Sequence, residues 1–335
     1  MIIGTFSPSL TSNAITIFQK KRVTDDYSET DVAGTGSGQN PDDPTLQGNG
    51  PTRLAYHALR SGASTEWEYS NLKIGQNGNF WLDQYKDIIY WDYSTPTYST
   101  APGYDFLWKV TSIGVDPDGL IKEYNNYAPV RDGVQNVVFT GRMSADKTLI
   151  IGVSTKYDAS GNAQYFLRIM TMNFFPWDQT LPTYSLNDLA GTYSFQKLGA
   201  LSNQDGTVTS SWAYGQMNIT GSGVTTFPSY NDSSSATSSS DTFTLSYYPD
   251  PGSDGKTYSD FANFTTPAQS GSSRYYDSNG KPLYTYYNFW SYGGTSVIPI
   301  SPYYCNEHGS LSYIKDLFVM TRTDLLGNSM ILALK

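Results

Sequence analysis

Short runs of apolar and β-branched residues, separated by Gly, Asn and Asp, recur along most of the chain. One example is the run at residues 149–153, followed by a turn-forming stretch at 158–162 and a second apolar run at 165–169. This order is typical of a β-hairpin, because Gly and Asn adopt the turn conformations that most residues avoid. Few segments have apolar residues at helical spacing. The pattern therefore predicts an all-β fold built mostly of antiparallel hairpins.

The two halves of the chain repeat the same features in the same order. Residues 67–74, which begin with Trp-x-Tyr, match residues 212–219, and residues 147–155 match residues 315–323. Upstream of these, Tyr56 and its neighbours parallel Phe195 and its neighbours. Three matches in one order indicate an internal duplication. Propeller blades repeat at only ~40–50 residues, which is shorter than this repeat. A meander that closes into a barrel, and so leaves no exposed edge strands, fits the longer repeat. The duplication predicts two tandem antiparallel meander β-barrels.

The matches divide the chain into four parts. We expect an N-terminal hairpin at residues 1–22, a Gly-, Asp- and Pro-rich linker at 23–52, a first barrel at 53–180 and a second barrel at 181–335. The second barrel is longer than the first, and the additional residues form an aromatic-rich insert between Gly223 and Lys315.

The N-terminal hairpin resembles the hairpin that closes each barrel. Residues 1–5 are similar to residues 149–153, and an Asn-Ala pair precedes an apolar strand in both places. The hairpin is interpreted as a remnant of a preceding repeat in a longer array, as an element that pairs with a neighbour as an added strand, or as an accidental likeness between two hairpins. The apolar residues that would make an assembly contact are Ile2, Ile3, Ile15, Ile17 and Phe18.

Each unit contains the same three features in the same order. They are a strand that carries Tyr or Phe, the motif Trp-x-Tyr, and a closing hairpin of the type Ser-x-Asp-Lys-x-Leu-Ile-Ile-Gly. Residues 144–152 carry the full closing pattern, and residues 312–320 depart from it at the final Gly. This pattern resembles the tandem lipocalin-like (calycin-like) β-barrel repeats of secreted bacterial proteins. The resemblance covers roughly residues 53–335, implies the barrel fold and implies no catalytic residues. The chain lacks the Gly-x-Trp that lipocalins carry near their first strand.

Charge and composition narrow the class of protein. The 335 residues include 21 basic and 30 acidic ones, which gives a net charge of −9 and excludes a nucleic-acid partner. No apolar run approaches the ~18 residues of a membrane-spanning helix, and the single cysteine, Cys305, excludes an internal disulfide framework. Abundant Ser, Thr, Gly, Asn and Tyr are typical of exported proteins. We expect an extracellular or cell-surface location, with a signal peptide that is absent from the sequence.

Few residues suggest catalysis or metal binding. Two histidines, His57 and His308, are too few for a histidine-rich metal site, and a Cys–His nucleophile at Cys305 and His308 would need a lowered thiol pKa and precise orientation. Residues 116–119 and 250–255 offer carboxylates to calcium, but neither completes the EF-hand spacing, and turn chemistry explains both. The sequence therefore predicts no catalytic residues, no metal and no cofactor, and a protein that is not an enzyme.

Aromatic residues gather in two stretches. If exposed, they would form platforms for sugar rings or for a protein partner, and if buried, they would fill a barrel or the joint between barrels. The candidate platform residues are Trp81, Tyr90, Trp91 and Tyr93 in the first stretch and Tyr284, Tyr286, Phe289, Trp290 and Tyr292 in the second.

The leading functional hypothesis is a non-enzymatic extracellular structural, assembly or adhesive protein. Its partner would be a copy of itself or another surface protein, contacted through the N-terminal hairpin. One alternative is a carbohydrate-binding module that uses the aromatic platforms on a polysaccharide. The other is a lipocalin-like carrier of a small apolar ligand.

Overall fold

The computed structural model describes part of the chain. The described residues are 2–9, 12–18, 27–28, 31, 52–60, 66–74, 80–82, 89–92, 97–100, 111–125, 136–157, 161–174, 184–202, 208–233, 242–247, 250–251, 257–258, 263–265, 307–324 and 327–335. For the first two strands and for the three short strands between residues 80 and 100, the description covers the backbone alone.

The first sheet, which we call the first unit, contains ten antiparallel strands in the order β7-β6-β4-β3-β12-β11-β10-β9-β8, with β5 paired to β4. Its strands are β3 (Thr52–Arg60), β4 (Glu66–Ile74), β5 (Phe80–Leu82), β6 (Ile89–Asp92), β7 (Thr97–Thr100), β8 (Thr111–Val115), β9 (Leu120–Asn125), β10 (Asn136–Met143), β11 (Leu149–Tyr157) and β12 (Ala163–Phe174). Strand β8, at one edge, approaches β5 near the other edge, so the sheet curls toward a barrel.

The second sheet, the second unit, has nine antiparallel strands in the order β16-β15-β14-β13-β23-β22-β21-β20-β17. They are β13 (Gly191–Ser202), β14 (Val208–Ile219), β15 (Val224–Asp232), β16 (Thr242–Thr244), β17 (Ser246–Tyr247), β20 (Asn263–Thr265), β21 (Glu307–Leu311), β22 (Leu317–Asp324) and β23 (Gly327–Leu334). The two edge strands β16 and β17 are separated in sequence by Leu245 alone, which brings the edges together. A short helix, α2 (Leu186–Leu189), precedes β13, and β18 (Asp250–Pro251) pairs with β19 (Thr257–Tyr258).

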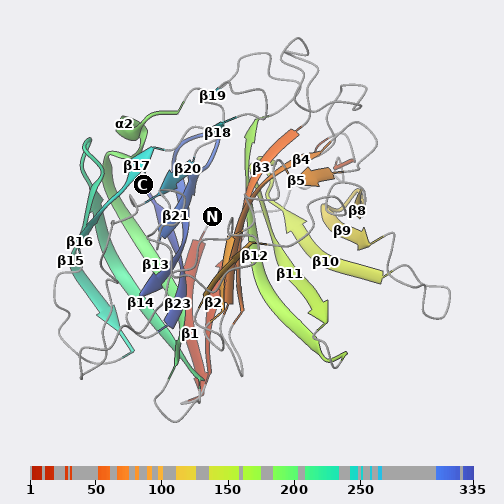
Figure 1. Cartoon of the computed structure of the whole chain (residues 1–335), viewed down its shortest axis with the longest axis horizontal. Helices are drawn as coiled ribbons and strands as arrows, with labels where there is room; N and C mark the ends of the chain where they lie inside the picture. Colours follow the sequence, from red (N-terminus) through yellow and green to blue (C-terminus); the bar gives the residue numbers. More distant parts are fainter. Residues whose placement is uncertain are drawn as a thin grey trace, which may run out of the picture.

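The predicted all-β fold of two tandem antiparallel units with an extra N-terminal hairpin is confirmed (Figure 1). The two units have the same hairpin registers. Leu59 lies opposite Trp67 in the β3–β4 pair, and Leu198 lies opposite Trp212 in the β13–β14 pair. We call β3–β4 and β13–β14 the opening hairpins, and β11–β12 and β22–β23 the closing hairpins. The equivalent turns before β11 and β22 each place a lysine in the left-handed region, Lys147 at φ 63° and Lys315 at φ 60°.

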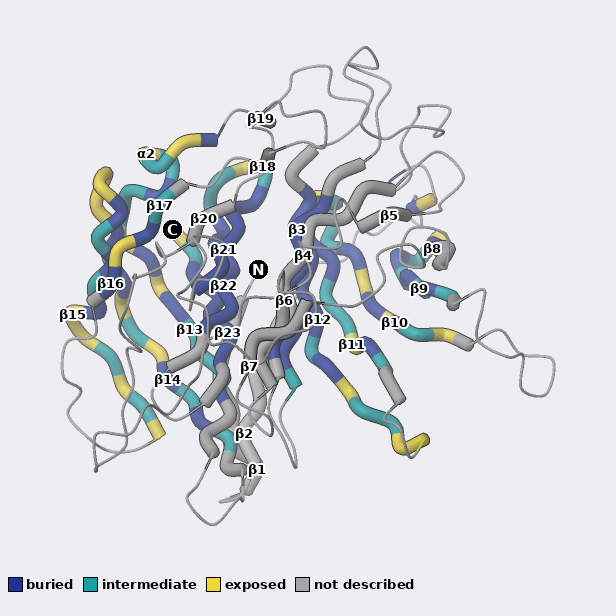
Figure 2. The backbone as a smooth tube through the Cα atoms, viewed as in Figure 1, coloured by how far each residue is buried: buried dark blue, intermediate teal, exposed yellow. Residues whose placement is uncertain are grey.

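Alternation along the strands produces a separate hydrophobic core in each unit. In β12, Phe166, Met170 and Met172 point into the first core, while Ile169 and Thr171 lie on the opposite face of the sheet. All five side chains are nevertheless buried, because the second unit covers part of that opposite face. Figure 2 shows buried residues concentrated on the strands where the two units meet.

Bulky rings lie directly over glycines in both cores. A Cβ added to Gly309 in β21 would lie 2.3 Å from Cζ of Phe318 in β22. The equivalent glycine of the first unit, Gly141 in β10, is covered by the ring of Phe139, whose Cζ would lie 2.4 Å from an added Cβ. These glycines leave the space that the rings fill.

The N-terminal hairpin consists of β1 (Ile2–Ser9) and β2 (Ser12–Phe18), which form a two-stranded sheet of their own. Ile2 lies opposite Phe18, and Ile3 lies opposite Ile17. Both strands lie against β13 and β14 of the second unit, although the hairpin precedes the first unit in sequence. In Figure 1 it lies at the foot of the molecule, close to β14.

Candidate functional site

The contact between the two units, which we call the seam, is made by different elements on its two sides. Strands β22 and β23, the closing hairpin of the second unit, pack on β3 and β4, the opening hairpin of the first. Strand β21 also approaches β12. Because a closing hairpin meets an opening hairpin, the contact is heterologous rather than two-fold symmetric.

Both histidines lie in the seam. His57 of β3 and His308 of β21 are buried, and the ring of Trp67 in β4 lies 5.2 Å from the ring of His308. His57 Nε2 lies 2.8 Å from the hydroxyl oxygen of Ser310, and His57 Nδ1 lies 3.3 Å from Oγ1 of Thr321. Each side of this network comes from a different unit, so it fixes how the units are aligned.

Burial determines the chemistry of His57. Removal of the imidazole from water, assisted by the nearby His308, lowers the pKa of His57 to about 3. The ring is therefore neutral at physiological pH. Thr171 of β12 completes the polar group, with its hydroxyl oxygen 3.2 Å from that of Ser310.

The pair of Ser310 and His57 has the distance of a nucleophile and its general base. Both residues have no exposed surface, so a substrate could not reach the hydroxyl. A histidine with a pKa of about 3 is also a poor base at neutral pH. The pair therefore serves to align the units, because buried polar groups need hydrogen-bond partners.

The interior of the first unit contains a buried ion pair. Arg168 of β12 donates from Nη1 to Oε2 of Glu123 in β9 at 2.7 Å, and both side chains are more than nine-tenths buried. The guanidinium lies 4.4 Å from the ring centre of Tyr56 and 4.9 Å from that of Phe139. Among the described residues, Arg168 Nε and the hydroxyl of Ser154 are buried and have no hydrogen-bond partner.

The interior of the second unit has a polar row at different positions. Glu307, Arg322 and Ser329 are cross-strand neighbours on β21, β22 and β23, and all three are buried. Arg322 Nε lies 3.8 Å from Oε1 of Glu307, and the guanidinium lies 5.0 Å from the ring centre of Phe243. The equivalent positions in the first unit are Phe139, Ser154 and Phe166, so the two units have different interiors.

In each unit, the lysine of the turn before the closing hairpin binds an aspartate from the segment that precedes the unit. We call these two equivalent ion pairs the clamps. Lys147 Nζ lies 2.5 Å from Oδ1 of Asp31, whose Oδ2 accepts the backbone N–H of Ser28 at 2.8 Å. The same lysine lies 5.6 Å from the ring centre of Tyr27, which is buried in the first core. Tyr27, Ser28 and Asp31 thus belong to the surroundings of the first unit.

In the second unit, Lys315 Nζ lies 2.8 Å from Oδ1 of Asp188, and Oδ2 of Asp188 accepts the backbone N–H of Ser185 at 2.7 Å. The ring centre of Tyr184 lies 5.3 Å from the same lysine. Burial alone would raise the pKa of Asp188, but hydrogen bonds from Lys315 and Ser185 outweigh it and hold this pKa below its usual value.

The sequence contained a signal for these clamps that hydrophobic patterning misses. Residues 27–35 and 184–192 share the motif Tyr-Ser-x-x-Asp, followed by an aliphatic residue and Ala-Gly-Thr. A comparison of these two segments would have extended the duplication upstream of residue 53. The second copy runs directly into β13, whereas the first copy is separated from β3 by residues 36–51.

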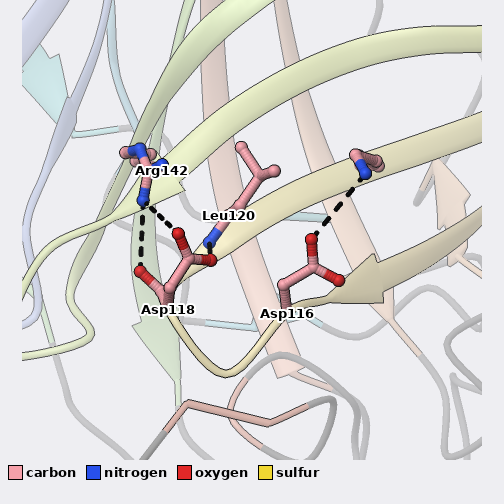
Figure 3. Close-up of polar contacts among 5 residues, drawn as sticks. Asp116, Asp118, Leu120 and Arg142 are labelled. Atoms are coloured by element: carbon pink, nitrogen blue, oxygen red, sulfur yellow. Dashed lines mark hydrogen bonds and ion pairs between the residues drawn. The ribbon is translucent and has the colours of Figure 1, made fainter. Parts of the chain in front are cut away.

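The acidic turn at residues 116–119 follows turn chemistry, as expected. Asp118 Oδ1 accepts the backbone N–H of Leu120 at 3.1 Å, and its Oδ2 lies 3.0 Å from Nη1 of Arg142 (Figure 3). Asp116 lies 3.7 Å from Nζ of Lys122. Both carboxylates face cations, and no group of three potential metal ligands occurs in the described part of the chain.

Most of the predicted site residues lie where side chains are not described. Trp81 is in β5, and Tyr90 and Trp91 are in β6, where Trp91 lies opposite Trp67 of β4. For these three, and for Ile2, Ile3, Ile15, Ile17 and Phe18 in the N-terminal hairpin, only the backbone is described. The candidates outside the described residues altogether are Tyr93, Tyr284, Tyr286, Phe289, Trp290 and Tyr292, together with Cys305. Among the helices that are described, none has the length and hydropathy of a membrane span.

Comparison with known proteins does not assign a family. No protein-family model matches the chain, and no curated sequence matches it. Among solved structures, a protein of unknown function from the DUF3598 family of Nostoc punctiforme is 11% identical, with a TM-score of 0.23, over 89% of this chain and 99% of that one.

Two further solved structures are similar at the same level. A putative AttH from Nitrosomonas europaea is 10% identical, with a TM-score of 0.22, over 90% of this chain and 99% of that one. Kievitone hydratase from Nectria haematococca is 9% identical, with a TM-score of 0.19, over 95% and 98%. At these TM-scores the similarity supports no inference about function, and the resemblance to tandem lipocalin-like repeats stays a prediction.

Proposed function

We propose that the chain is a non-catalytic building block that associates head to tail with copies of itself. In this arrangement, the closing hairpin β11–β12 of one copy packs on the opening hairpin β13–β14 of the next. The contact repeats between chains the kind of contact that the seam makes within one chain. Because a heterologous contact does not close on itself in general, repetition produces an open row. The protein would act outside the cell or at the cell surface, as a structural or adhesive component.

The observation that carries this proposal is an apolar face on the closing hairpin of the first unit. Val153 is 46% exposed and Tyr165 is 63% exposed, although both are large and apolar in body. Ile151 and Leu167 beside them are half-buried. We call these four residues the β11–β12 face. Clustered exposed apolar side chains are typical of interaction surfaces.

Comparison of the units supports the same use of this face. Val319 and Met330 in the closing hairpin of the second unit stand at the positions of Ile151 and Leu167. Both have no exposed surface, because the seam covers them. The β11–β12 face of the first unit is thus equivalent to the face that the second unit buries in the seam. In the first unit this face stays partly exposed.

The receiving surface would be the opening hairpin of the second unit. Trp212 of β14 stands at the position of Trp67, which contacts His308 across the seam. The ring of Trp212 is stacked on that of Tyr214, with centres 5.7 Å apart, and Tyr214 is 40% exposed. A half-exposed aromatic pair at this position suits an apolar partner.

The N-terminal hairpin lies against this same opening hairpin. In a single copy it takes part of the place that a neighbour would occupy, and we infer that it limits association until it is displaced. This assigns to residues 1–18 the role of a terminal cap, which repeat arrays need where stacking ends.

The absence of catalysis is part of the proposal. It is supported by the complete burial of His57 and Ser310 and by the low pKa of His57. Carbohydrate binding by the aromatic stretches stays a prediction, because their side chains lie outside the described residues.

The test compares the full chain with a truncated chain that lacks residues 1–22, by size-exclusion chromatography with light scattering over a wide range of concentration. We expect the truncated chain to associate more strongly as concentration rises, and added peptide 1–20 to reverse this. A scrambled peptide is the control. A truncated chain of unchanged mass at every concentration would contradict the proposal, and so would association that truncation abolishes, which would indicate a hairpin donated to a neighbour.

A further inference from the structure

We infer that the seam is an acid-sensitive joint, which opens when its buried histidines take up protons and leaves each of the two units folded. This opening takes place within one chain and does not depend on association between copies. It would separate the closing hairpin of the second unit from the opening hairpin of the first.

Among the described side chains of the seam, the two histidines are the groups that titrate near neutral pH. His57 of β3 and His308 of β21 come from different units, and both are buried. The hydroxyl oxygens of Ser310 and Thr321 lie 2.8 Å and 3.3 Å from the ring nitrogens of His57. The ring of Trp67 lies 5.2 Å from that of His308. Both imidazoles are thus held between the two units.

A proton on His57 is incompatible with this packing. The neighbouring hydroxyls are dipoles and do not neutralise a buried cation, whose removal from water is costly. Burial, together with the nearby His308, accordingly lowers the pKa of His57 to about 3. In an open seam water would solvate the imidazolium, and the pKa would return to its ordinary value of about 6.5. Acid therefore favours the open form.

The charged side chains of β12, β21 and β22 face away from the seam. Glu307 of β21 and Arg322 of β22 point into the second unit, where Nε of Arg322 lies 3.8 Å from Oε1 of Glu307. Arg168 of β12 points into the first unit, where it donates to Glu123 at 2.7 Å. These charges lie on the opposite faces of the sheets from His57, and each is close to an opposite charge.

The remaining strands of the seam carry residue types whose charge does not change in weak acid. Register places Tyr69 of β4 opposite His57, and Arg53 and Lys73 form a pair further along the same face. Ordinary Tyr, Lys and Arg side chains do not titrate between pH 5 and 7. Strand β23 contributes apolar side chains to the seam. Within the described seam, the charge that changes between pH 5 and 7 is therefore that of the histidines.

The two units can separate because they share no strand pairing in the described part of the chain. Their sheets are separate, and each encloses its own hydrophobic core. Residues 175–183 connect β12 to the segment that precedes β13. Opening of the seam therefore breaks contacts between side chains and leaves the backbone hydrogen bonds of both sheets intact.

Three buried methionines distinguish an open seam from an unfolded chain. Met330 of β23 has no exposed surface and stands opposite Thr321, whose hydroxyl oxygen contacts His57. Met320 of β22 is equally buried in the second core, and Met170 of β12 is 2% exposed in the first core. Hydrogen peroxide converts an exposed methionine to its sulfoxide. An open seam exposes Met330 to this reagent and leaves the other two protected.

The test treats the full chain with hydrogen peroxide at pH 7 and pH 5, at concentrations where it is monomeric. Peptide mass spectrometry measures the oxidation of each methionine, and each rate is divided by that of free methionine at the same pH. We expect the rate at Met330 to rise at least about 25-fold from pH 7 to pH 5, because the open form binds a proton that the closed form excludes. Met320 and Met170 should stay protected at both pH values.

Variants assign the response to the histidines. His57→Gln should reduce the rise at Met330 by at least about ten-fold, and His57→Gln together with His308→Gln should abolish it. Asp188→Asn, which removes an acidic group of the clamp in the second unit, is the control and should keep the wild-type rise. Circular dichroism and the protection of Met320 at pH 7 verify that each variant is folded.

Three results would overturn the inference. They are a rate at Met330 that does not change with pH, a rise that all three methionines share, and a rise at Met330 that persists in the double variant. None of these results bears on the association of truncated chains at neutral pH, so the two proposals fail separately.

Discussion

His57 and Ser310, which are 253 residues apart in sequence, meet across the seam with 2.8 Å between Nε2 and the hydroxyl oxygen. One residue comes from β3 of the first unit and the other from β21 of the second. Because the two residues belong to different units, the hydrogen bond exists only when the units are packed together, and this packing buries both residues fully. The ionisation of His57 therefore reports on the seam.

Acidification is expected to weaken the folded state through His57. The pKa of His57 is lowered to about 3 in the folded chain, whereas an exposed histidine has a pKa of about 6.5. The unfolded chain thus binds a proton between these values that the folded chain does not bind. The stabilisation is complete above about pH 6.5 and decreases by up to about 1.4 kcal/mol per pH unit as the pH falls toward 3. Urea unfolding at several pH values measures this slope.

The His57→Gln variant is the matched comparison, because an amide keeps hydrogen-bonding capacity without titrating in this range. Its free energy of unfolding should depend less steeply on pH than that of the wild type between pH 6.5 and 4. Identical slopes for the two proteins would show that His57 is not buried in the seam.

The clamp of the second unit is expected to contribute to stability. Replacement of Lys315 by Met removes the partner of Asp188 and should lower the free energy of unfolding at neutral pH by about 1 kcal/mol, since the pair is only partly exposed. Lys122→Met is the control, because the 3.7 Å pair of Lys122 and Asp116 is more exposed and should contribute almost nothing.

The pH dependence of this variant provides an independent check. The pKa of Asp188 lies below its usual value, so the stabilisation by its carboxylate is present above about pH 4 and is lost as the pH falls through the lowered pKa. The difference in stability between Lys315→Met and the wild type should therefore shrink in strong acid. A difference that does not change with pH would refute the ion pair as its cause.

Substitution of Gly309 is expected to disturb the second core. An alanine Cβ at this position would lie 2.3 Å from Cζ of Phe318, so the ring must move and Gly309→Ala should destabilise the chain by roughly 1–3 kcal/mol, as overpacking does. The added change Phe318→Leu should recover part of this loss. Gly114→Ala, where the nearest atom would lie at 3.4 Å, should cost much less in the same thermal unfolding experiment. Equal losses at the two positions would contradict the close packing of Phe318 on Gly309.

Local patterns were sufficient to predict the strands, the hairpins and the duplication. Turn residues and alternation act over a few residues, and they predicted that Trp67 and Trp212 are equivalent, which the shared register with Leu59 and Leu198 confirms. The extra N-terminal hairpin was predicted in the same way. Its strands resemble those of the closing hairpins because all of them need the same apolar alternation.

The sites depended on contacts that no local pattern contains. Alternation indicates that His57 and Tyr56 point to opposite faces of β3, but which outer face becomes buried depends on how the second unit packs. The core position of Arg168 likewise follows from its strand, whereas its pairing with Glu123 depends on the order of strands across the sheet. The hydrophobic pattern did not predict the roles of Tyr27 and Asp31, because the composition of their segment is that of a polar linker.

Head-to-tail association is the central claim, and a mixing experiment by sedimentation velocity tests it most directly. Two truncated chains that lack residues 1–22 are prepared, one with Val153→Glu to block the β11–β12 face and one with Tyr214→Glu to block β14. Each variant alone should stay monomeric. An equimolar mixture should form dimers and nothing larger, because one intact face of each kind remains. A mixture that stays monomeric, or variants that each associate alone, would contradict the claim.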